Sequence, residues 1–431
     1  MSMKKFKFVL KMAVGAPSKS IVEIDEEVKR GQCIAEPISL GCKIHSSVNG
    51  IVKKITDSYI EIQQTESDLK DYLKIKECES ISEYAFESGI VGSGGAGFPS
   101  HIKLSTKLNG GYVLANAAEC EPVLSHNVEL MGKNPELVVK GVKYAMESTG
   151  SEMGYIAMKP KYLKAAMAIG KVLKNYENIE IKWLPNIYPA GDERVIVREV
   201  LGIELQPGEL PSKANAVVFN VETLKNLVLA IEDRKPVIDK DITVGGRVVD
   251  AEKGKVFSNV PIGASVKEYI EKSGGYIFPY GEIVSGGPFT GSAITEDAPI
   301  TKTTGGILVA MPYPKDTRKV GIIACECGAG EERLTEIAHG MGGEVVAETK
   351  CKRMVEVNGR YRCDKPGICP GQAEKVLFLK RQGAEVIITG TCEDWTNTVM
   401  TVAPRLGVPV YHSTDHVLRG ARHKIYRSKK N

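Results

Sequence analysis

Hydrophobic and polar positions alternate with a period of two in short runs over residues 1–75, and glycines separate the runs. Such alternation is typical of half-buried β-strands. Over residues 76–235, apolar runs of strand length alternate with segments of helical periodicity, including one helix predicted over residues 131–149. Alternating strands and helices predict an α/β layer with a parallel sheet. The sequence therefore predicts a small β module followed by an α/β domain.

The pattern changes twice more along the chain. Between residues 236 and 314 it returns to short strands and glycine turns, with one helix predicted over Val266–Lys272. We expect a compact β-grasp fold there. From Lys319 strands and helices alternate again, after prolines that mark a boundary. Because 431 residues exceed one ordinary core, we predict a multidomain α/β protein with domains at 1–75, 76–235, 236–314 and 315–431.

Composition narrows the function classes. A hydrophobic content of 42% with 26% charged residues is that of a globular protein. Lysine and arginine, 57 in all, nearly balance 53 acidic residues, which gives little support for nucleic acid binding. No apolar stretch approaches the roughly 20 residues of a membrane helix. We expect a cytoplasmic protein without a signal peptide and without membrane insertion.

The ten cysteines are unevenly placed. Cys33, Cys42, Cys78 and Cys120 are scattered, and we expect them to be small buried hydrophobes. The other six gather in the last quarter of the chain: Cys325, Cys327, Cys351, Cys363, Cys369 and Cys392. In an intracellular chain, such clustering favours redox or metal chemistry over structural disulfides.

Two of the clustered cysteines, Cys325 and Cys392, each follow an apolar strand. Turn amides or a helix N-terminus at such a position would lower the thiol pKa. We therefore predict that Cys325, Cys327 and Cys392 are exposed thiols that pass electrons to a partner protein. A disulfide between Cys325 and Cys327 would be strained, which favours separate roles for these two. The alternative is a metal or iron–sulfur site that uses Cys351, Cys363 and Cys369, although the spacing fits no standard pattern.

A glycine-rich loop lies within GIVGSGGAGFPSHIKL, residues 89–104. Its closely spaced glycines are Gly92, Gly94, Gly95 and Gly97. Such a loop lets backbone N–H groups approach a phosphate closely. The plain alternative is a tight turn. Because the order differs from the Rossmann G-x-G-x-x-G fingerprint, a different nucleotide loop is implied.

Three polar segments follow the glycine loop. The strand YVLANAAECEP ends in Asn116, Glu119 and Glu121, at the edge where α/β proteins bind ligands. A strand-to-helix junction carries Tyr188, Gly191, Asp192 and Glu193, and a helix start carries Asn220 and Thr223. Each segment alone could be a solvated strand end or a helix cap.

Together and in this order, the four segments resemble the flavoprotein subunit of respiratory complex I and the RnfC protein of the Rnf electron-transport complex. The resemblance implies that the glycine loop, with Phe98 and Lys103, holds the FMN phosphate and frames the NADH site. It also implies that Glu119 and Glu121 help to orient the nicotinamide. The remaining pocket residues implied by the resemblance are Asn116, Tyr188, Gly191, Asp192, Glu193, Asn220, Glu222 and Thr223.

The likeness to RnfC extends over residues 1 to about 312. It implies a barrel-sandwich hybrid at the N-terminus, a Rossmann-like FMN- and NADH-binding domain, and a soluble-ligand-binding β-grasp (SLBB) domain. RnfC proteins typically continue into C-x₂-C-x₂-C-x₃-C-P runs, which this sequence lacks.

The cysteine-rich tail, with segments such as ICPGQAEKV and TGTCEDW, instead resembles the family of proline reductase-associated electron transfer proteins (PrdC). That resemblance implies an NADH-oxidising flavoprotein oxidoreductase that passes electrons through FMN and thiols to a partner reductase, D-proline reductase. The alternatives are an iron–sulfur subunit of an Rnf-type membrane complex and a flavin-free scaffold protein.

Overall fold

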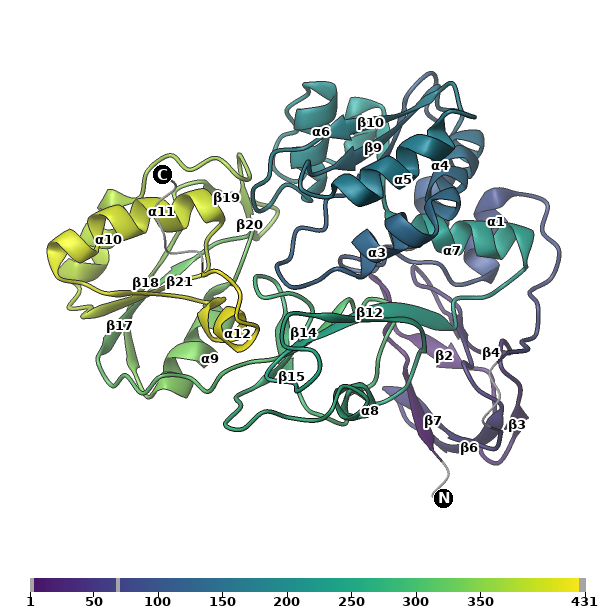
Figure 1. Ribbon diagram of the computed structural model, residues 1–431, viewed down its shortest axis with the longest axis horizontal. Coiled ribbons are helices and arrows are strands. Elements are labelled where there is room, and N and C mark those ends of the chain that lie inside the picture. The colour runs from purple at the N-terminus through teal and green to yellow at the C-terminus, as the bar shows by residue number, and fades with distance from the viewer. Residues whose placement is uncertain (1–3, 67–69, 426–431) are drawn as a thin grey trace.

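In the computed structural model, residues 4–66 and 70–425 are described, and six β-sheets run through them (Figure 1). The N-terminal module contains two of these sheets. One has the order β1 (Lys5–Val9), β7 (Tyr59–Gln64), β6 (Gly50–Ile55) and β3 (Glu27–Val28). The other has β2 (Ser18–Ser20), β4 (Cys33–Pro37) and β5 (Ile44–His45). Along β1, Phe6 and Phe8 are buried while the residues between them are not, so the predicted period of two is confirmed.

The next unit is a parallel sheet with helices, as predicted. Its order is β10 (Ile179–Trp183), β9 (Met153–Met158), β8 (Tyr112–Ala117) and β11 (Ala216–Asn220). The helices of this unit are α1 (Ile81–Glu87), α2 (Ser100–Leu104), α3 (His126–Lys133), α4 (Pro135–Thr149), α5 (Leu163–Leu173), α6 (Glu193–Leu201) and α7 (Val221–Glu232), with a 3-10 turn at Pro211–Ala214.

The single helix predicted over residues 131–149 is wrong: α3 ends at Lys133 and α4 begins at Pro135. The physical reason is Pro135, which has no N–H to continue a helix and pushes the preceding residue out of the helical region. Asn134 accordingly has φ −132° and ψ 55°. The break lets the chain change direction before α4 packs against α7.

The strand order of the parallel sheet contains a reversal point. Strands β8, β9 and β10 follow one another across the sheet in one direction, whereas β11 returns to the other side of β8. In open α/β sheets, ligands bind outside the carboxyl ends of the strands at such a reversal point. Asn116 of β8 and Asn220 of β11 are register partners there. The fold therefore places two of the predicted site residues at the reversal point.

The third unit is a mixed sheet. Its order is β13 (Lys255–Pro261), β12 (Asp239–Gly246), β16 (Gly306–Val309), β14 (Ile283–Ser285) and β15 (Ser292–Ile294). Helix α8 (Val266–Glu271) lies within one residue of its predicted bounds. The β-grasp assignment and the four domain boundaries stay predictions.

The C-terminal unit is again a parallel sheet, as its strand and helix pattern predicts. Its order is β18 (Glu344–Lys350), β17 (Lys319–Ala324), β21 (Val386–Thr389) and β22 (Val410–His412). A hairpin, β19 (Met354–Val357) and β20 (Arg360–Cys363), extends from it. Its helices are α9 (Glu331–Met341), α10 (Ala373–Arg381), α11 (Glu393–Val402) and α12 (Asp415–Gly420), with a 3-10 turn at Pro404–Leu406.

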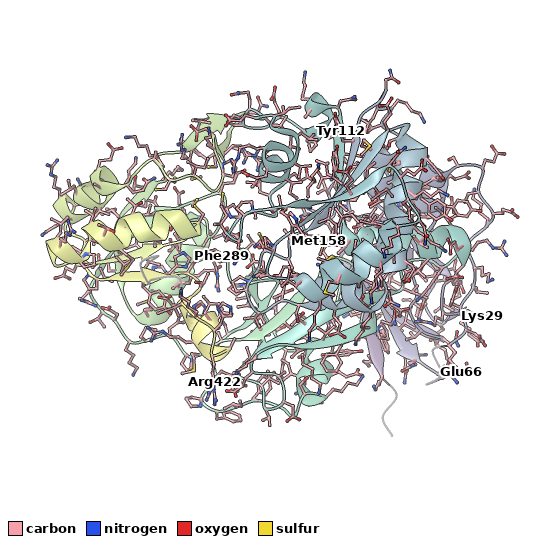
Figure 2. The ribbon with its side chains drawn as sticks, turned by 45° about the horizontal axis from the view of Figure 1, so that its top comes forward. Lys29, Glu66, Tyr112, Met158, Phe289 and Arg422 are labelled. Carbon is pink, nitrogen blue, oxygen red and sulfur yellow. The ribbon has the colours of Figure 1, made fainter. Side chains whose placement is uncertain are left out.

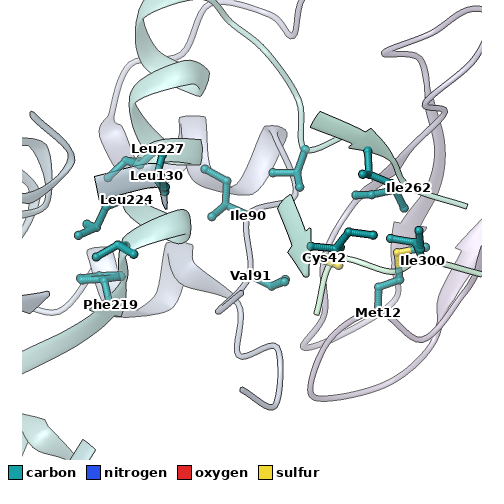
Figure 3. Close-up of a cluster of buried hydrophobic side chains, with 14 of the residues drawn as sticks. Met12, Cys42, Ile90, Val91, Leu130, Phe219, Leu224, Leu227, Ile262 and Ile300 are labelled. Atoms are coloured by element: carbon teal, nitrogen blue, oxygen red, sulfur yellow. The ribbon is translucent and has the colours of Figure 1, made fainter. Parts of the chain in front are cut away.

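The largest buried cluster is shared between the first three units. Met12 and Cys42 of the N-terminal module pack together with Ile300 of the third unit, and Ile90 connects them to α7 (Figure 3). The C-terminal sheet contributes to two further clusters, one of which contains five buried cysteines together with Tyr188 and Phe289 from the neighbouring units. Within the described ranges, no helix is both long and apolar enough to span a bilayer.

Candidate functional site

The glycine loop lies between α1 and α2, and its tip is open. Gly94, Gly95 and Ala96 are exposed, and a Cβ added to Gly95 would meet no atom within 4 Å. On the neighbouring side, a Cβ on Gly94 would lie 2.7 Å from Asn220 Nδ2. The loop therefore approaches the start of α7 as closely as glycine allows and keeps free space on its other side.

Both ends of the loop are fixed by residues that are distant in the chain. The Thr223 hydroxyl accepts a hydrogen bond from the Ser93 N–H (3.0 Å) and donates one to the Val91 carbonyl (3.2 Å). At the far end Gly97 has φ +72°, and its carbonyl accepts from the Val14 N–H (3.1 Å). A positive φ is a conformation that glycine adopts without strain. Helix α7 and the N-terminal module thus hold the loop in place.

Glu119 is the predicted acidic residue whose side chain is least satisfied. Its backbone has φ +33°, and its carbonyl accepts a hydrogen bond from the Tyr162 hydroxyl (2.9 Å). Its Oε2 is buried and has no hydrogen-bond partner among the described residues. Unusual backbone angles and orphaned buried polar atoms are concentrated at functional sites. Glu119 is therefore poised to accept a hydrogen bond from a ligand.

The other predicted acid, Glu121, is engaged by the third unit. Its carboxylate accepts hydrogen bonds from the backbone N–H groups of Phe289 (2.9 Å) and Thr290 (3.0 Å) and from the Thr290 hydroxyl (2.7 Å). Burial raises the pKa of Glu121, and these donors oppose that rise. Glu121 therefore joins the third unit to the edge of the parallel sheet.

Two further predicted residues meet each other beside the loop. Lys103 Nζ lies 2.6 Å from Glu193 Oε1 and donates to the Val218 carbonyl (2.9 Å). Glu193 opens α6, for which the Asp192 side chain is the N-cap and accepts from the Arg194 N–H (2.9 Å). Burial raises the pKa of Asp192. The positive charge predicted for the loop is thus present and already paired.

Two predicted pocket residues have their polar atoms engaged elsewhere. The Tyr188 ring stacks on Phe289 at 3.7 Å, and its hydroxyl donates to the Cys327 carbonyl. Glu222 is fully buried, with its oxygens bonded to Lys240 Nζ and to the Asp241 N–H. Tyr188 therefore faces the C-terminal unit and stacks on Phe289 of the third unit, which is labelled in Figure 2. Glu222 anchors α7 to β12.

Cys120 has polar contacts that sequence reasoning missed. Its sulfur accepts hydrogen bonds from the Gly191 N–H (2.9 Å) and from Lys159 Nζ (3.4 Å). Burial raises the pKa of the Cys120 thiol above its ordinary value, and the Lys159 charge offsets only part of that rise. The expectation that the four scattered cysteines are all buried is wrong, because only Cys42 is buried while Cys33, Cys78 and Cys120 are partly exposed.

Several contacts of the site carry a sequence signal and others do not. Lys159 directly follows β9, so its place at the carboxyl edge of the sheet could have been predicted. Phe289 and Thr290 lie 168 and 169 residues from Glu121 in the chain. No local pattern could have paired them with Glu121.

The clustered cysteines come together at one edge of the C-terminal sheet. Cys325, Cys327, Cys351, Cys363 and Cys392 belong to one buried cluster. Cys325 is only 2% exposed and Cys327 only 7%. The prediction that Cys325, Cys327 and Cys392 are exposed is therefore wrong. The reason is that other parts of the chain pack on this edge: Cys363 at the end of the hairpin contacts Cys327, and the Tyr188 hydroxyl donates to the Cys327 carbonyl.

The sulfur atoms of this cluster contact one another. The Cys325 thiol interacts with the Cys327 and Cys351 thiols, and the Cys327 thiol interacts with the Cys363 thiol. These contacts lower the pKa of Cys325. Cys369, from the alternative ligand set, lies 3.2 Å from the Thr398 hydroxyl. In the part of the chain that the structure describes, no group of three or more His, Cys, Asp or Glu side chains is placed to hold a metal ion.

The residues at the reversal point fit a flavin mononucleotide. The exposed glycine tip has room for a phosphate within reach of its amides, and the unpaired Glu119 oxygen offers an acceptor for a polar ring group. Asn220 Nδ2 lies beside Gly94 as a further donor. Gly94, Gly95, Glu119 and Asn220 are therefore the residues that would hold this cofactor.

Comparison with known protein families agrees with this geometry. Residues 85–229 match the model of the Nuo51 FMN-binding domain, and residues 1–70 match the RnfC barrel sandwich hybrid domain. The chain thus belongs to a class of flavoprotein oxidoreductases, and FMN and NADH are the cofactors of this class.

Individual relatives narrow this class further. The chain is 40% identical over 232 residues to cobalamin reductase PduS of Salmonella typhimurium, an alignment that covers 54% of this chain and 50% of PduS. It is 31% identical over 319 residues to the RnfC-type component of the Na⁺-translocating ferredoxin:NAD⁺ oxidoreductase complex of Acetobacterium woodii, which covers 69% of this chain and 71% of that protein. The chain belongs to this family, the RnfC family.

Coverage differs between these relatives. The chain spans about half the length of the PduS proteins that it matches. It is also 32% identical to the corresponding component of the proton-translocating ferredoxin:NAD⁺ oxidoreductase complex of Clostridium ljungdahlii, with 68% of each chain covered. The match to the Nuo51 FMN-binding domain, residues 85–229, contains the glycine loop and therefore the unit that carries the candidate site.

Proposed function

We propose that this protein oxidises NADH at an FMN held between β8 and β11 and passes the electrons to a partner reductase. Two observations carry the proposal: the open glycine tip next to Asn220 at the end of β11, and the buried, unpaired oxygen of Glu119, which follows the neighbouring strand β8. When bound, FMN supplies hydride acceptance and the division of electron pairs into single electrons.

The residues of the chain have separate tasks in this proposal. The amides at Gly94 and Gly95 bind the phosphate, where the paired Lys103 lies nearby. Glu119 orients the nicotinamide or the flavin by accepting a hydrogen bond. Glu121 keeps the third unit closed over the edge of the sheet, which limits access of water.

The electrons then leave through the cysteine-rich unit, and we propose D-proline reductase as the acceptor. Support comes from the tail segments ICPGQAEKV and TGTCEDW and from the contact of Tyr188 with Cys327, which joins the two redox units. PduS is a cobalamin reductase by name, so cobalamin is the second candidate acceptor.

Anaerobic reconstitution tests the proposal. The full chain is loaded with FMN and titrated with NADH, and flavin absorbance and protein thiols are followed together. Bleaching of the flavin by one equivalent of NADH, followed by the appearance of thiols, is the expected result. D-proline reductase and a cobalamin are then offered separately, and reoxidation of the flavin identifies the acceptor.

The two alternatives give different results in the same preparation. An iron–sulfur protein would contain iron and acid-labile sulfide in fixed proportion to the chain. A flavin-free scaffold would show no flavin absorbance after reconstitution and gel filtration. Either result would exclude the proposed route from NADH through FMN to the thiols.

A further inference from the structure

Three cysteines lie at the same edge of the C-terminal sheet because of its parallel topology. Cys325 follows Ala324 at the end of β17, and Cys351 follows Lys350 at the end of β18, where Ala324 and Lys350 are register partners. The Cys351 N–H donates to the Ala324 carbonyl (3.0 Å). The carboxyl ends of parallel neighbours lie side by side, so the Cys325 and Cys351 sulfurs start from adjacent positions. Cys392 follows β21 on the other side of β17.

A fourth cysteine is delivered by the hairpin. Cys363 ends β20, and its N–H donates to the Glu326 carboxylate, which lies between Cys325 and Cys327 in the chain. Arg194 of α6 (3.0 Å) and Arg362 (2.7 Å) bind the same carboxylate. This network fixes the hairpin end, so that the Cys363 thiol contacts the Cys327 thiol.

The sulfur contacts therefore form a row in the order Cys351, Cys325, Cys327 and Cys363. The two outer contacts each join cysteines from different strands. The middle contact joins Cys325 to Cys327, which are separated by one residue, so a disulfide there would close a small strained ring. Only the outer pairing can use all four sulfurs at once.

We infer that these four cysteines form two reversible disulfides, Cys325–Cys351 and Cys327–Cys363, which together store four electrons next to the flavin unit. The inference rests on the proposed function and names the groups that hold its electrons. For each pair, an S–S bond breaks and two thiols form when two electrons and two protons are added. One NADH and one proton from the medium supply these, and NAD⁺ is released.

The polar surroundings of the row suit thiol–disulfide chemistry. The Cys325 sulfur accepts hydrogen bonds from the backbone N–H groups of Cys327 and Cys392. The Cys351 sulfur accepts from the Arg353 N–H (3.4 Å) and from Gln372 Nε2 (3.5 Å). Donors of this kind stabilise the thiolate, which is the form that attacks or leaves a disulfide. All four sulfurs are buried, so small oxidants and reductants reach them more slowly than they reach a surface thiol.

Thiol counting on the full chain tests the inference. The anaerobic, fully reduced protein has ten thiols, which are counted after unfolding and alkylation. Treatment of the folded protein with diamide should oxidise four of these thiols to two disulfides, and dithiothreitol should reduce the disulfides again. Cys369→Ser is the matched control, because Cys369 adjoins the cluster but bonds to Thr398, and the loss of four thiols should persist in it.

Peptide mapping identifies the pairing. Trypsin releases Cys325 and Cys327 together in residues 320–333, Cys351 in residues 351–352, and Cys363 together with Cys369 in residues 363–375, because the bond before Pro366 resists cleavage. The map is therefore made in Cys369→Ser, in which Cys363 is the one cysteine of its peptide. The oxidised protein should give one species that joins all three peptides. In Cys351→Ser only two thiols should be used, and residues 320–333 should remain joined to the Cys363 peptide.

Other outcomes would overturn the inference. One is an internal disulfide within residues 320–333 with Cys351 and Cys363 left reduced. Another is zinc or iron bound in fixed proportion and released when the four thiols are alkylated. A flavin that NADH bleaches while the thiols stay oxidised would also count against the store. A further result separates the two proposals. If diamide forms the two disulfides and dithiothreitol reduces them, but NADH with FMN does not reduce them, the disulfide pairing holds and the proposed function is refuted.

Discussion

At the scale of single residues, the site is defined by one position with free space around it and one buried polar atom without a hydrogen-bond partner. The Gly95 position faces free space, and Glu119 Oε2 has no partner among the described residues, while Lys103 and Glu121 are already bonded within the chain. Gly95 and Glu119 are therefore the residues expected to contact the cofactor directly. The bonded groups position the walls of the site.

We expect Gly95→Asp to abolish FMN binding with little effect on stability. An added side chain meets no protein atom there, but a carboxylate would occupy the phosphate position and repel it. Quenching of FMN fluorescence on titration measures the loss, which should be at least about 100-fold in Kd, or roughly 3 kcal/mol.

Gly132→Asp is the control for this change, since Gly132 also has open space around it but lies in α3. It should bind FMN like the unaltered chain. A Gly95→Asp protein that binds FMN with undiminished affinity would show that the loop does not hold the phosphate.

At the scale of elements, buried charges tie α7 to β12. Lys240 and Glu222 are each 0% exposed and form an ion pair. The neighbouring Lys225–Asp241 pair, at 2.6 Å, joins the same two elements. Because α7 also carries Thr223 and is capped by Asn220, these pairs fix the helix that supports the glycine loop.

Lys240→Met should destabilise the protein by about 3–5 kcal/mol, because it leaves the Glu222 carboxylate buried without its cation. The double variant Lys240→Met with Glu222→Met should recover most of this loss, since apolar replacement of a whole buried pair is often neutral. Urea unfolding followed by circular dichroism gives both values.

The exposed pair Lys140–Glu232 (2.9 Å) provides the comparison. Lys140→Met should change the free energy of unfolding by no more than about 1 kcal/mol. If Lys240→Met were equally mild, the buried pair would not be what holds α7 on β12.

The sequence pattern predicted the strands and helices better than the contacts between them. The strand and helix alternation placed β8 to β11 and the parallel topology, since apolar periodicity reports each element locally. It missed the break at Pro135, where backbone restriction overrides helical periodicity. It could not show that Phe289 and Thr290 bind Glu121 or that the hairpin end contacts Cys327, because such contacts depend on how distant segments pack.

At the scale of the whole molecule, one carboxylate joins the third unit to the C-terminal unit. Glu282, the residue before β14, binds Arg333 of α9 and lies 2.7 Å from His416 Nε2 of α12. Burial alone would raise the pKa of Glu282, but the hydrogen bonds from His416 and Arg333 outweigh it and lower the pKa to about 2. Burial lowers the pKa of His416.

Both shifts predict loss of stability in acid. A carboxyl group with a depressed pKa stabilises the fold above its unfolded value of 4.5, and that contribution disappears as the pH falls toward about 2. His416 acts in the same direction, because its protonation below 6.5 is disfavoured in the fold. Tm should therefore fall steadily as the pH is lowered from 6.5 to about 2.

Glu282→Ala should be less stable at neutral pH by about 1–3 kcal/mol, because the partly buried Arg333 loses its hydrogen-bond acceptor. Its Tm should also depend less on pH between 4.5 and about 2 than that of the unaltered chain. Scanning calorimetry across this range checks both effects. Glu331→Ala removes a carboxylate from the more exposed pair with Lys350, and its Tm should depend on pH as in the unaltered chain. If the Tm of Glu282→Ala also kept the full dependence on pH, Glu282 would not be the group that causes it.

The anchoring of Gly97 has a consequence for how the protein can be divided. Its carbonyl is held by Val14, and its α-carbon packs beside Met12 and Thr303. An excised α/β unit would lack two of the walls that shape its own cofactor loop. Gene fusions or natural truncations that separate residues 1–70 from the rest should therefore yield an apoprotein, even where the parallel sheet itself folds.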